Sequence, residues 1–523
     1  MQDKKLWLVL LLALLSIGAN FWGFPIYILD EARNSACAME MMQRGDWVVP
    51  TFNGELRTDK PPLHYFFMIA SYKAFGIFPF AARVFSVIMG VLTVWVVYFF
   101  VKKLINQRAA FFSALILVSS LAFVIEFHLA VPDPYLVFFL TASWLCFIYA
   151  YQSKIKRMYD LSYASMAMAF MAKGPVAVVL SGIIFLLFLL LLEDFSWETL
   201  KRLSVLKGVM IFLIITVPWW AAVTVRTDGA WPTRFIMQHN VGRYSLAMEG
   251  HNGLPGLPIF FLFASLLPLA LYLPGATKSA WGQRKDSLLP FFSLVAASTV
   301  VAFFAFSKTI LLNYVAPGIP FGAIVIGAFI ERRLQNPFPL TVARKTASVL
   351  ALLVALAVPF ALRALISQDK WIYDLPELGW LFLPISMGAI AATIFLFRNQ
   401  WKESIMSYLL SFWLVGILLF YFAVPAIMAK NPVSGESLRL IDESGREVIG
   451  YRKFHDAYVF ALQRPLLDFY PIESLKAYIE DKKIIVITRK EHEAELQSIG
   501  LETVFEKPYL FENPDLVLMI NHP

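Results

Sequence analysis

Acidic side chains stand at two places where long apolar segments of the sequence end. Asp30 follows the first apolar run in FPIYILDEAR, and Asp133 lies between two prolines in HLAVPDPYL. A charged side chain costs about 2.5–3.5 kcal/mol at mid-membrane and less at the ends of a span, so an acid there needs water, a partner or a function. Carboxylates in these positions could take a proton from an acceptor hydroxyl.

Both acids also have simpler interpretations, which the sequence leaves open. Asp30 could be the N-cap of a helix over residues 31–44, with Glu31 complementing the helix dipole. Such a cap would not exclude chemistry, because a carboxylate held at a helix N-terminus keeps its charge and its direction. Asp133 could be a turn residue that caps the helix after it.

Cations accumulate in separate segments that interrupt the apolar sequence. Lys173 occurs in MAKGPV, where its ammonium group could also extend to the membrane interface. Further polar residues follow in FIMQHNVGRYSLAMEGHNG and FSKTILLNYVAPGIP, namely His239, Arg243, His251, Lys308 and Tyr314. Arg forms bidentate pairs with phosphate oxygens, and Lys supplies a point charge. Together with the two carboxylates, these cations indicate a transferase that acts on a lipid phosphate.

The elements that position these residues are predicted to be membrane helices. The chain has 523 residues, of which 59% are hydrophobic and only 16% are charged, and its mean hydropathy is +0.65. Apolar runs of roughly 20 residues recur up to about residue 428 and predict about 13 membrane-spanning helices. The first run, LWLVLLLALLSIGANFWGF, could pass for a signal peptide, but it lacks a clean cleavage site and we expect a retained helix.

Basic loops alternate along the chain and predict its orientation. They occur at 101–108, 153–157, 200–207, 278–285, 331–334 with Arg344 and Lys345, and 398–402. Because positive residues favour the cytoplasmic side, the N-terminus is expected in the cytoplasm and the first outer loop, residues 23–80, on the other face. The net charge of +8 is then mainly a topology signal, and no nucleic-acid partner is expected.

Two regions are predicted, a transmembrane region over 1–429 and a small extracytoplasmic α/β domain over 430–523. From Lys430 the apolar runs stop, and segments 482–488, 489–500, 503–506 and 515–520 predict strand, helix, strand and strand. This region has no glycine-rich nucleotide loop, so a structural or acceptor-docking role is expected. Cys37 and Cys146 are too far apart in sequence to predict a disulfide framework or a metal site.

Five sequence patterns occur in one order over nearly all of the first 430 residues. They are DEAR with GDWVVPTFNG and DKPPLHY, then PDPYL, AKGPV, HNVGRY and FSKTILLNYVAPGIP. This order resembles the GT-C glycosyltransferases, most closely the aminoarabinose-to-lipid A transferases and the protein O-mannosyltransferases. The resemblance implies a mainly α, GT-C type bundle with juxtamembrane helices on its outer face. It also implies inverting transfer of a sugar from a polyprenyl-phosphate carrier to lipid A or a related envelope acceptor, at the outer face of a bacterial inner membrane.

The resemblance assigns roles to individual residues. Asp30 would be the base or the acceptor-orienting carboxylate, and Asp133 the second acid of the family. The donor phosphate would be contacted by Lys60, with Arg33, Arg243, Tyr314, Lys308 and Lys173 as further partners. Polyprenyl phosphate has a second pKa of about 6, so it can leave as a dianion without a general acid.

One branch of the family places a metal beside the phosphate-contacting lysine, which implies a divalent metal such as zinc at Asp59, His239 and His251. The sequence departs from the family pattern at two positions. Asp59 stands where members usually carry the longer Glu, and Ala32 stands where the branch commonly has Pro.

Other functions remain open on the sequence alone. Within the enzyme class, the acceptor could be protein Ser/Thr or a growing surface polysaccharide. A lipid or ion transporter would place facing charges within the spans and discontinuous helices in related halves, whereas here the charges cluster on one outer face. A membrane-anchored scaffold would leave the cations of separate outer loops unexplained.

Overall fold

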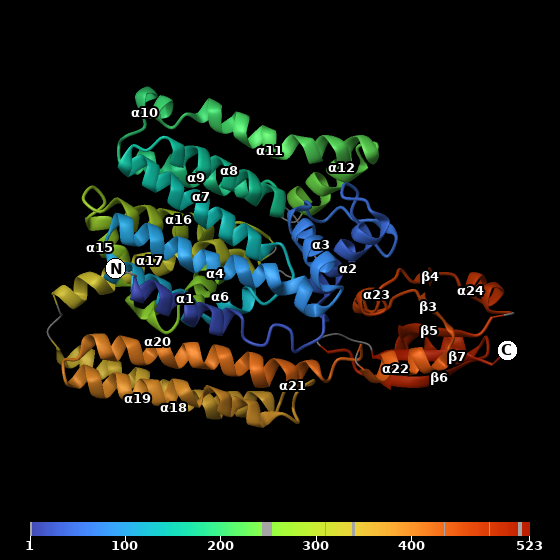
Figure 1. The fold of residues 1–523 in the computed structure, drawn as a ribbon. Coiled ribbons are helices and arrows are strands. Elements are labelled where there is room, and N and C mark those ends of the chain that lie inside the picture. Colours follow the sequence, from blue (N-terminus) through green and yellow to red (C-terminus); the bar gives the residue numbers. More distant parts are fainter. Residues whose placement is uncertain are drawn as a thin grey trace.

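The computed structural model describes residues 3–242, 254–308, 310–336, 340–433, 435–480, 482–510 and 515–522. These residues form a long helical bundle with a small sheet at one end (Figure 1). The first part contains α1 (Lys4–Ile17), α2 (Leu29–Arg44), α3 (Leu63–Phe75), α4 (Pro79–Leu104), α5 (Gln107–Ser119), α6 (Leu121–Glu126), α7 (Asp133–Ser153), α8 (Arg157–Lys173), α9 (Val176–Leu191), α10 (Trp197–Arg202), α11 (Val205–Arg226) and α12 (Ala230–Ile236).

The second part of the bundle continues after the short helix η1 (Met237–Gly242). It contains α14 (Leu257–Ser265), η2 (Leu269–Tyr272), α15 (Leu273–Gly282), α16 (Leu288–Ala305), η3 (Leu312–Gly318), α17 (Ile319–Gln335), α18 (Val342–Ile366), η4 (Pro376–Phe382), α19 (Leu383–Phe397), α20 (Trp401–Leu418), η5 (Leu419–Ala423) and α21 (Val424–Met428).

Eight helical segments of the described chain are long and apolar enough to cross a membrane, or nine with the bent pair Leu257–Ser265 and Leu269–Gly282. The sequence predicted about 13 spans from apolar runs of roughly 20 residues each. The two numbers differ because α1, α5, α8 and α9 have only 14, 13, 17 and 16 residues. A mainly helical, polytopic membrane fold is therefore confirmed.

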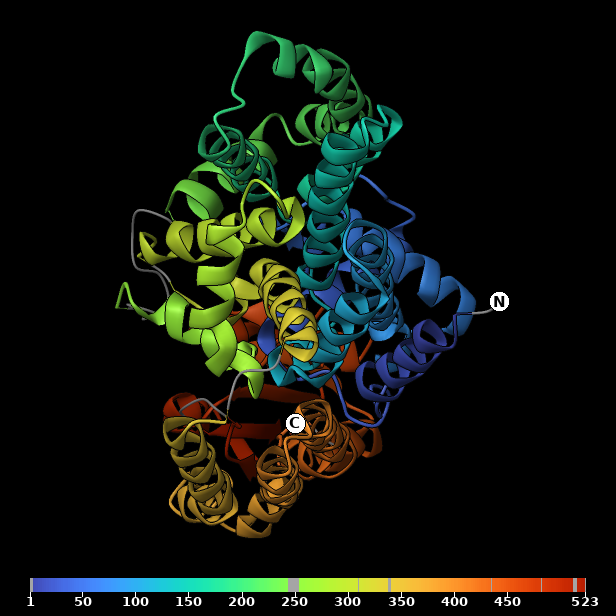
Figure 2. The same cartoon turned by 90° about the vertical axis from the view of Figure 1, so that its left-hand side faces the viewer.

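The bundle has a packed centre and an apolar periphery. The buried share of the apolar stretch is 89% in Leu312–Gln335 and 78% in Asp133–Ser153, but only 11% in Arg344–Ile366. Figure 2 shows α18, α19 and α20 as a group of their own along the lower edge of the bundle. At the centre, a Cβ on Gly327 of α17 would come within 2.7 Å of the backbone nitrogen of Ser113 in α5. Such close backbone approach is typical of packing between membrane helices.

The first outer loop folds much as its sequence indicates. Helix α2 ends at Gly45, whose φ of 66° is the left-handed conformation that glycine adopts readily. Asn53 and Gly54, with φ of 53° and 80°, form the predicted turn between β1 (Thr51–Phe52) and β2 (Glu55–Leu56). The Glu40 carboxylate holds this turn by accepting hydrogen bonds from the backbone nitrogens of Asn53 (2.6 Å) and Gly54 (3.2 Å).

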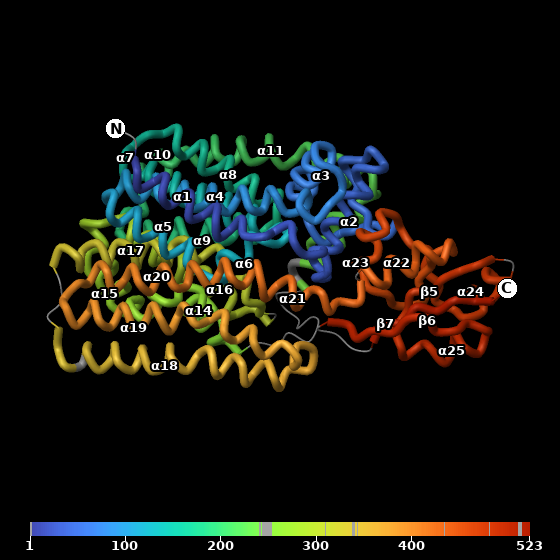
Figure 3. Tube along the Cα trace, turned by 60° about the horizontal axis from the view of Figure 1, so that its bottom comes forward, coloured from blue at the N-terminus to red at the C-terminus, as the bar shows by residue number. Residues whose placement is uncertain are grey.

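The last part of the chain forms a five-stranded mixed sheet in the order β4-β3-β5-β7-β6. Its elements are α22 (Gly435–Ser444), β3 (Glu447–Tyr451), α23 (Ala457–Ala461), β4 (Leu467–Phe469), α24 (Ile472–Ile479), β5 (Ile484–Arg489), η6 (Lys490–His492), α25 (Glu493–Gln497), β6 (Leu501–Lys507) and β7 (Leu516–Asn521). Strands β4, β3 and β5 pair in parallel, and β7 pairs antiparallel with β5 and β6. In Figure 3 this C-terminal region lies at the same end of the bundle as α2. Its helix α23 contacts α2.

Candidate active site

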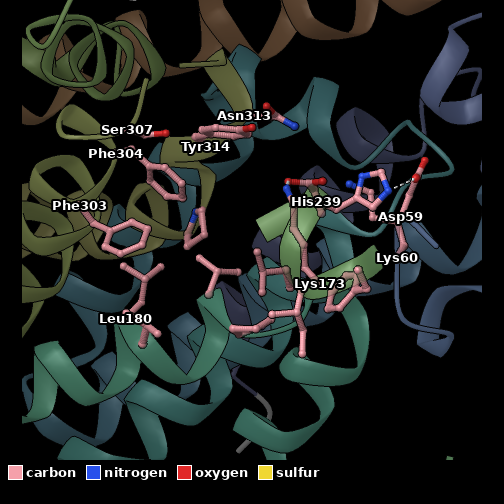
Figure 4. Close-up of a pocket in the computed structure, with 18 residues that line it drawn as sticks. Asp59, Lys60, Lys173, Leu180, His239, Phe303, Phe304, Ser307, Asn313 and Tyr314 are labelled. Atoms are coloured by element: carbon pink, nitrogen blue, oxygen red, sulfur yellow. Dashed lines mark hydrogen bonds and ion pairs between the residues drawn. The ribbon is translucent and has the colours of Figure 1, made fainter. Parts of the chain in front are cut away.

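A cavity of about 470 Å³ opens among segments that are far apart in sequence. The residues of its polar part are Asp59, Lys60, Asp133, Lys173, His239, Ser307, Asn313 and Tyr314. The residues of its apolar part are Leu136, Pro175, Val176, Val179, Leu180, Phe235, Ile236, Phe303, Phe304 and Pro317. Figure 4 shows Leu180 and Phe303 on one side of the cavity, and Asp59 and His239 on the other. The cavity therefore joins a charged region to an apolar slot.

The buried pair Asp133–Lys173 forms one polar wall of the cavity. The Lys173 ammonium donates a hydrogen bond to Asp133 Oδ1, and it also lies 5.6 Å from the ring centre of Tyr314. Asp133 makes no side-chain cap at α7, whose N-cap is Pro132, so the capping interpretation is wrong. Lys173, the last residue of α8, is held by Asp133 at the cavity.

A second charged group, Asp59 with His239, lies at the other end of the polar region. Asp59 Oδ1 lies 2.9 Å from His239 Nε2, and Asp59 Oδ2 lies 3.3 Å from Nη2 of Arg57. Burial alone would raise the pKa of Asp59, but the hydrogen bond from His239 and the charges of Arg57, His239 and Lys60 outweigh it and hold the pKa well below its usual range. Asp59 is therefore ionised at physiological pH, next to the buried Lys60.

Arg57 is itself fixed by a chain of hydrogen bonds that begins on α2. Asn34 Oδ1 accepts a hydrogen bond from Tyr65 Oη (3.2 Å), and Tyr65 Oη accepts one from Arg57 Nε (3.2 Å). Trp231 Nε1 donates to the Arg57 carbonyl at 2.8 Å. These contacts couple the position of Asp59 in the cavity to helix α2 and to helix α12.

Asp30 lies beside this cavity rather than in its lining. It is exposed in the first turn of α2, whose N-cap is Ile28, so the N-cap interpretation of Asp30 is wrong. Asp30 interacts electrostatically with Glu126, which in turn interacts with Asp133 and Lys173. The exposed residue Asp30 is thus linked to the charged wall of the cavity through Glu126.

The sequence analysis missed Glu126 as a member of this group. Its side chain is only 8% exposed, and among the described residues its Oε1 has no hydrogen-bond partner. Glu126 ends α6, seven residues before Asp133 in VIEFHLAVPD. An acid within an apolar run is the same signal that identified Asp133, and it was available in the sequence.

The structure does not bring every predicted phosphate ligand to the cavity. Arg33 pairs with Asp456 of the C-terminal region, and Lys308 is exposed; neither lines the cavity that the described residues form. Their predicted contact with a phosphate in this cavity is therefore not supported. Arg243 and His251 lie outside the described residues.

The buried ion pair Glu31–Arg83 was also missed. Arg83 donates to both Glu31 oxygens, from Nε at 2.6 Å and from Nη2 at 2.7 Å, and Glu31 Oε1 accepts a hydrogen bond from the Ala130 nitrogen at 2.9 Å. Glu31 follows Asp30 directly, and Ala130 precedes Asp133 by three residues. One buried carboxylate therefore joins the two segments that carry the predicted catalytic acids.

The predicted metal site is represented by two of its three residues. Two ligands about 2.0–2.1 Å from a tetrahedral zinc lie about 3.3 Å apart, which is close to the 2.9 Å between Asp59 and His239. Nδ1 of His239 has no hydrogen-bond partner among the described residues. Within those residues no group of three or more His, Cys, Asp or Glu is close enough to hold a metal. The described residues therefore supply two of the three predicted ligands and do not form a complete metal site.

Comparisons with known sequences agree with the motifs. A family model described as dolichyl-phosphate-mannose-protein mannosyltransferase matches residues 59–221. An undecaprenyl phosphate-alpha-4-amino-4-deoxy-L-arabinose arabinosyl transferase of Proteus mirabilis is 26% identical over 530 residues, which span 94% of this chain and 93% of that protein. An uncharacterized protein of Aquifex aeolicus is 29% identical over 64% of this chain and 74% of its own length.

Comparisons with solved structures agree on the fold. ArnT from Cupriavidus metallidurans bound to undecaprenyl phosphate matches with a TM-score of 0.84 at 19% identity, over 99% of this chain and 98% of that one. The Archaeoglobus fulgidus oligosaccharyltransferase matches with a TM-score of 0.53 at 11% identity, over 95% of this chain and 71% of that one. The resemblance to the GT-C glycosyltransferases, inferred from five motifs, is confirmed.

Proposed function

We propose that this chain is a GT-C type inverting glycosyltransferase that moves a sugar from a polyprenyl-phosphate carrier to lipid A or a related cell-envelope acceptor. Its arabinosyl transferase relatives are named for an undecaprenyl-phosphate-linked sugar, and the ArnT structure holds undecaprenyl phosphate. Protein Ser/Thr is the second candidate acceptor, because the matching family model describes a protein mannosyltransferase.

The observation that carries this proposal is the form of the cavity. Its apolar slot, which includes Leu180, Phe303 and Phe304, suits a prenyl chain, and its polar end holds Lys60 and Lys173. Fixed cations in a partly desolvated site stabilise the charge that develops on a leaving phosphate. No acid is needed for departure, since a phosphate monoester can leave as the dianion.

The two predicted acids then take different roles. Asp133 holds Lys173 inside the cavity, on the donor side. Asp30 lies outside the lining and is exposed, so it acts on the acceptor. A hydroxyl acceptor would need Asp30 as a general base, whereas an acceptor that is already an anion would need it only for orientation.

The proposal includes a topology and a location. It counts the nine candidate spans and the shorter helices α1, α5, α8 and α9 as 13 crossings, the number predicted from the sequence. With the basic loops in the cytoplasm, an odd number of crossings puts the C-terminal α/β domain and the cavity on the periplasmic side of a bacterial inner membrane.

The first test is transfer of radiolabelled sugar from polyprenyl-phosphate donors by the purified full-length protein in lipid vesicles. The wild type is expected to label lipid A, and Lys60→Ala to lower kcat/KM about 10²–10³-fold, as for the loss of one charge-stabilising group. Lys308→Ala is the matched control, because Lys308 is exposed and does not line the cavity.

The destination of the label decides between the proposed acceptors. Label in protein or in polysaccharide would replace lipid A by the second class of acceptor. No transfer by the wild type from any donor, in vesicles that contain folded protein, would contradict the enzyme assignment and favour a transporter.

The proposal also includes a divalent metal, zinc, held by Asp59 and His239 together with groups outside the described residues. Bound zinc would supply positive charge next to Lys60. We expect protein incubated with zinc and then dialysed to retain about one zinc per chain, and Asp59→Ala to retain much less. Metal analysis measures this independently of activity, with the exposed Glu55→Ala as control. Equal, near-zero zinc in all three proteins would contradict this part of the proposal.

A further inference from the structure

The C-terminal region contacts the segment around Asp30 on both sides of this residue. Three positions before it, the hydroxyl of Tyr27 accepts a hydrogen bond from the Leu510 nitrogen (2.9 Å) and donates one to the Leu510 carbonyl (3.1 Å). Three positions after it, Arg33 forms an ion pair with Asp456. A segment of seven residues, 27–33, is thus tied at both ends to the C-terminal region.

The Tyr27 contact lies in a buried part of the interface between this segment and the C-terminal region. Tyr27 and His455 are each 2% exposed, and their rings stack at 4.3 Å with planes only 4° apart. Burial, together with the charges of Arg489 and Arg33, lowers the pKa of His455 to about 3, so its ring is neutral at physiological pH. The neutral His455 ring therefore supports Tyr27 by packing alone. The ion pair Arg33–Asp456 is the charged contact between this segment and the C-terminal region.

Arg33 has another carboxylate within reach of its position in the helix. Residues three apart lie on the same helix face, where an acid and an arginine attract each other. An Arg33 that turned toward Asp30 would stabilise its ionised form, lower its basicity and occupy the oxygens that an acceptor needs. In the structure Arg33 is bound instead to Asp456, whose side chain is only 14% exposed.

We propose that Asp456 is a positioning residue for Asp30. The ion pair with Asp456 keeps the Arg33 side chain turned away from Asp30. The Asp30 carboxylate then stays directed to the acceptor. The C-terminal region, to which sequence analysis assigned only a structural or docking role, thereby takes part in turnover. The inference rests on the proposed glycosyl transfer and concerns the acceptor side of that reaction.

The test compares full-length wild type, Asp456→Asn and Asp456→Glu in the vesicle transfer assay. Asp456→Asn is expected to lower kcat about tenfold with an unchanged KM for the donor, and Asp456→Glu to retain most of the rate. With a hydroxyl acceptor, the acidic limb of the kcat profile should also move to lower pH, because a released Arg33 lowers the pKa of Asp30. Glu126 of α6 also acts electrostatically on Asp30, and it is the same in all variants.

Glu495→Gln is the matched control, because Glu495 pairs with Arg452 at 2.8 Å inside the C-terminal region. It should match the wild type in rate and in pH profile. Hydrogen exchange of residues 28–33 gives a readout without activity, and we expect faster exchange in Asp456→Asn.

Three results would overturn the inference. The first is a wild-type kcat and wild-type hydrogen exchange in Asp456→Asn. The second is an equal loss of kcat in Asp456→Asn and Asp456→Glu together with a lowered melting temperature of both variants. The third, absence of transfer by the wild type itself, would overturn the proposed function as well, and so it differs from the first two.

Discussion

Asp30→Asn is expected to reduce sugar transfer about 10²–10⁴-fold with a protein acceptor or any other hydroxyl acceptor, the usual effect of removing a general base. Asparagine keeps the shape and the helix position of Asp30 but cannot take a proton. Because Asp30 lies outside the lining of the donor cavity, the KM for the donor should stay within about twofold. Steady-state kinetics with varied donor and acceptor concentrations measure both effects.

The size of the loss identifies the role of Asp30. With an anionic acceptor such as a lipid A phosphate, no proton has to be removed, and a loss of only about tenfold is expected from lost orientation. The matched control is Glu55→Gln, an exposed acid of the same outer loop, which should keep the wild-type rate. Full activity of Asp30→Asn with every acceptor would contradict any catalytic role of this residue.

Much of the fold follows from patterns that act over short distances in the sequence. The turn at Asn53 and Gly54, the end of α2 at Gly45 and the four predicted elements after residue 482 depend on local backbone preferences and on apolar alternation. The elements between 435 and 480 were missed, because β3 and β4 are short strands whose place in the sheet depends on pairing with β5.

The candidate site was predicted in part, and the contacts that the sequence did not reveal have a common cause. Asp133, Lys173 and Tyr314 come together as expected, since each is a polar residue in an apolar segment. Arg33 was expected at the donor phosphate, but its partner Asp456 lies 423 residues later in the chain. Contacts over such separations depend on the packing of whole regions, and no local pattern in one sequence reveals them.

The pair Glu31–Arg83 shows the same limit most clearly. Glu31 was interpreted only as a charge at a helix N-terminus, although its carboxylate is 1% exposed and Arg83 is fully buried. Arg83 also donates to the backbone carbonyls of Phe21 (3.0 Å) and Phe24 (2.8 Å), and its guanidinium lies 3.9 Å from the ring centre of Phe24. Arg83 stands in the apolar run FAARVFSV, and a charged residue in such a run indicates a buried partner of opposite charge.

Arg83→Met is accordingly expected to destabilise the folded protein by about 3–5 kcal/mol, the usual cost of leaving one member of a buried ion pair without the other. Unfolding by denaturant in mixed micelles measures the change. The control is Lys102→Met, which removes a half-exposed partner of Asp3 and should cost no more than about 1 kcal/mol. A change below about 1 kcal/mol in Arg83→Met would contradict the structural role of the pair.

Replacing both partners separates the charge from the hydrogen bonds that the pair makes to the backbone. In Glu31→Leu/Arg83→Met no charge is left buried and unpaired, so part of the lost stability should return. The return should stay incomplete, since the carbonyls of Phe21 and Phe24 and the nitrogen of Ala130 lose their partners at about 1–3 kcal/mol each. Turnover should remain low even where this double variant folds, because the segments that carry Asp30 and Asp133 are then no longer joined. Wild-type turnover in the double variant would show that the two acids keep their places without this pair.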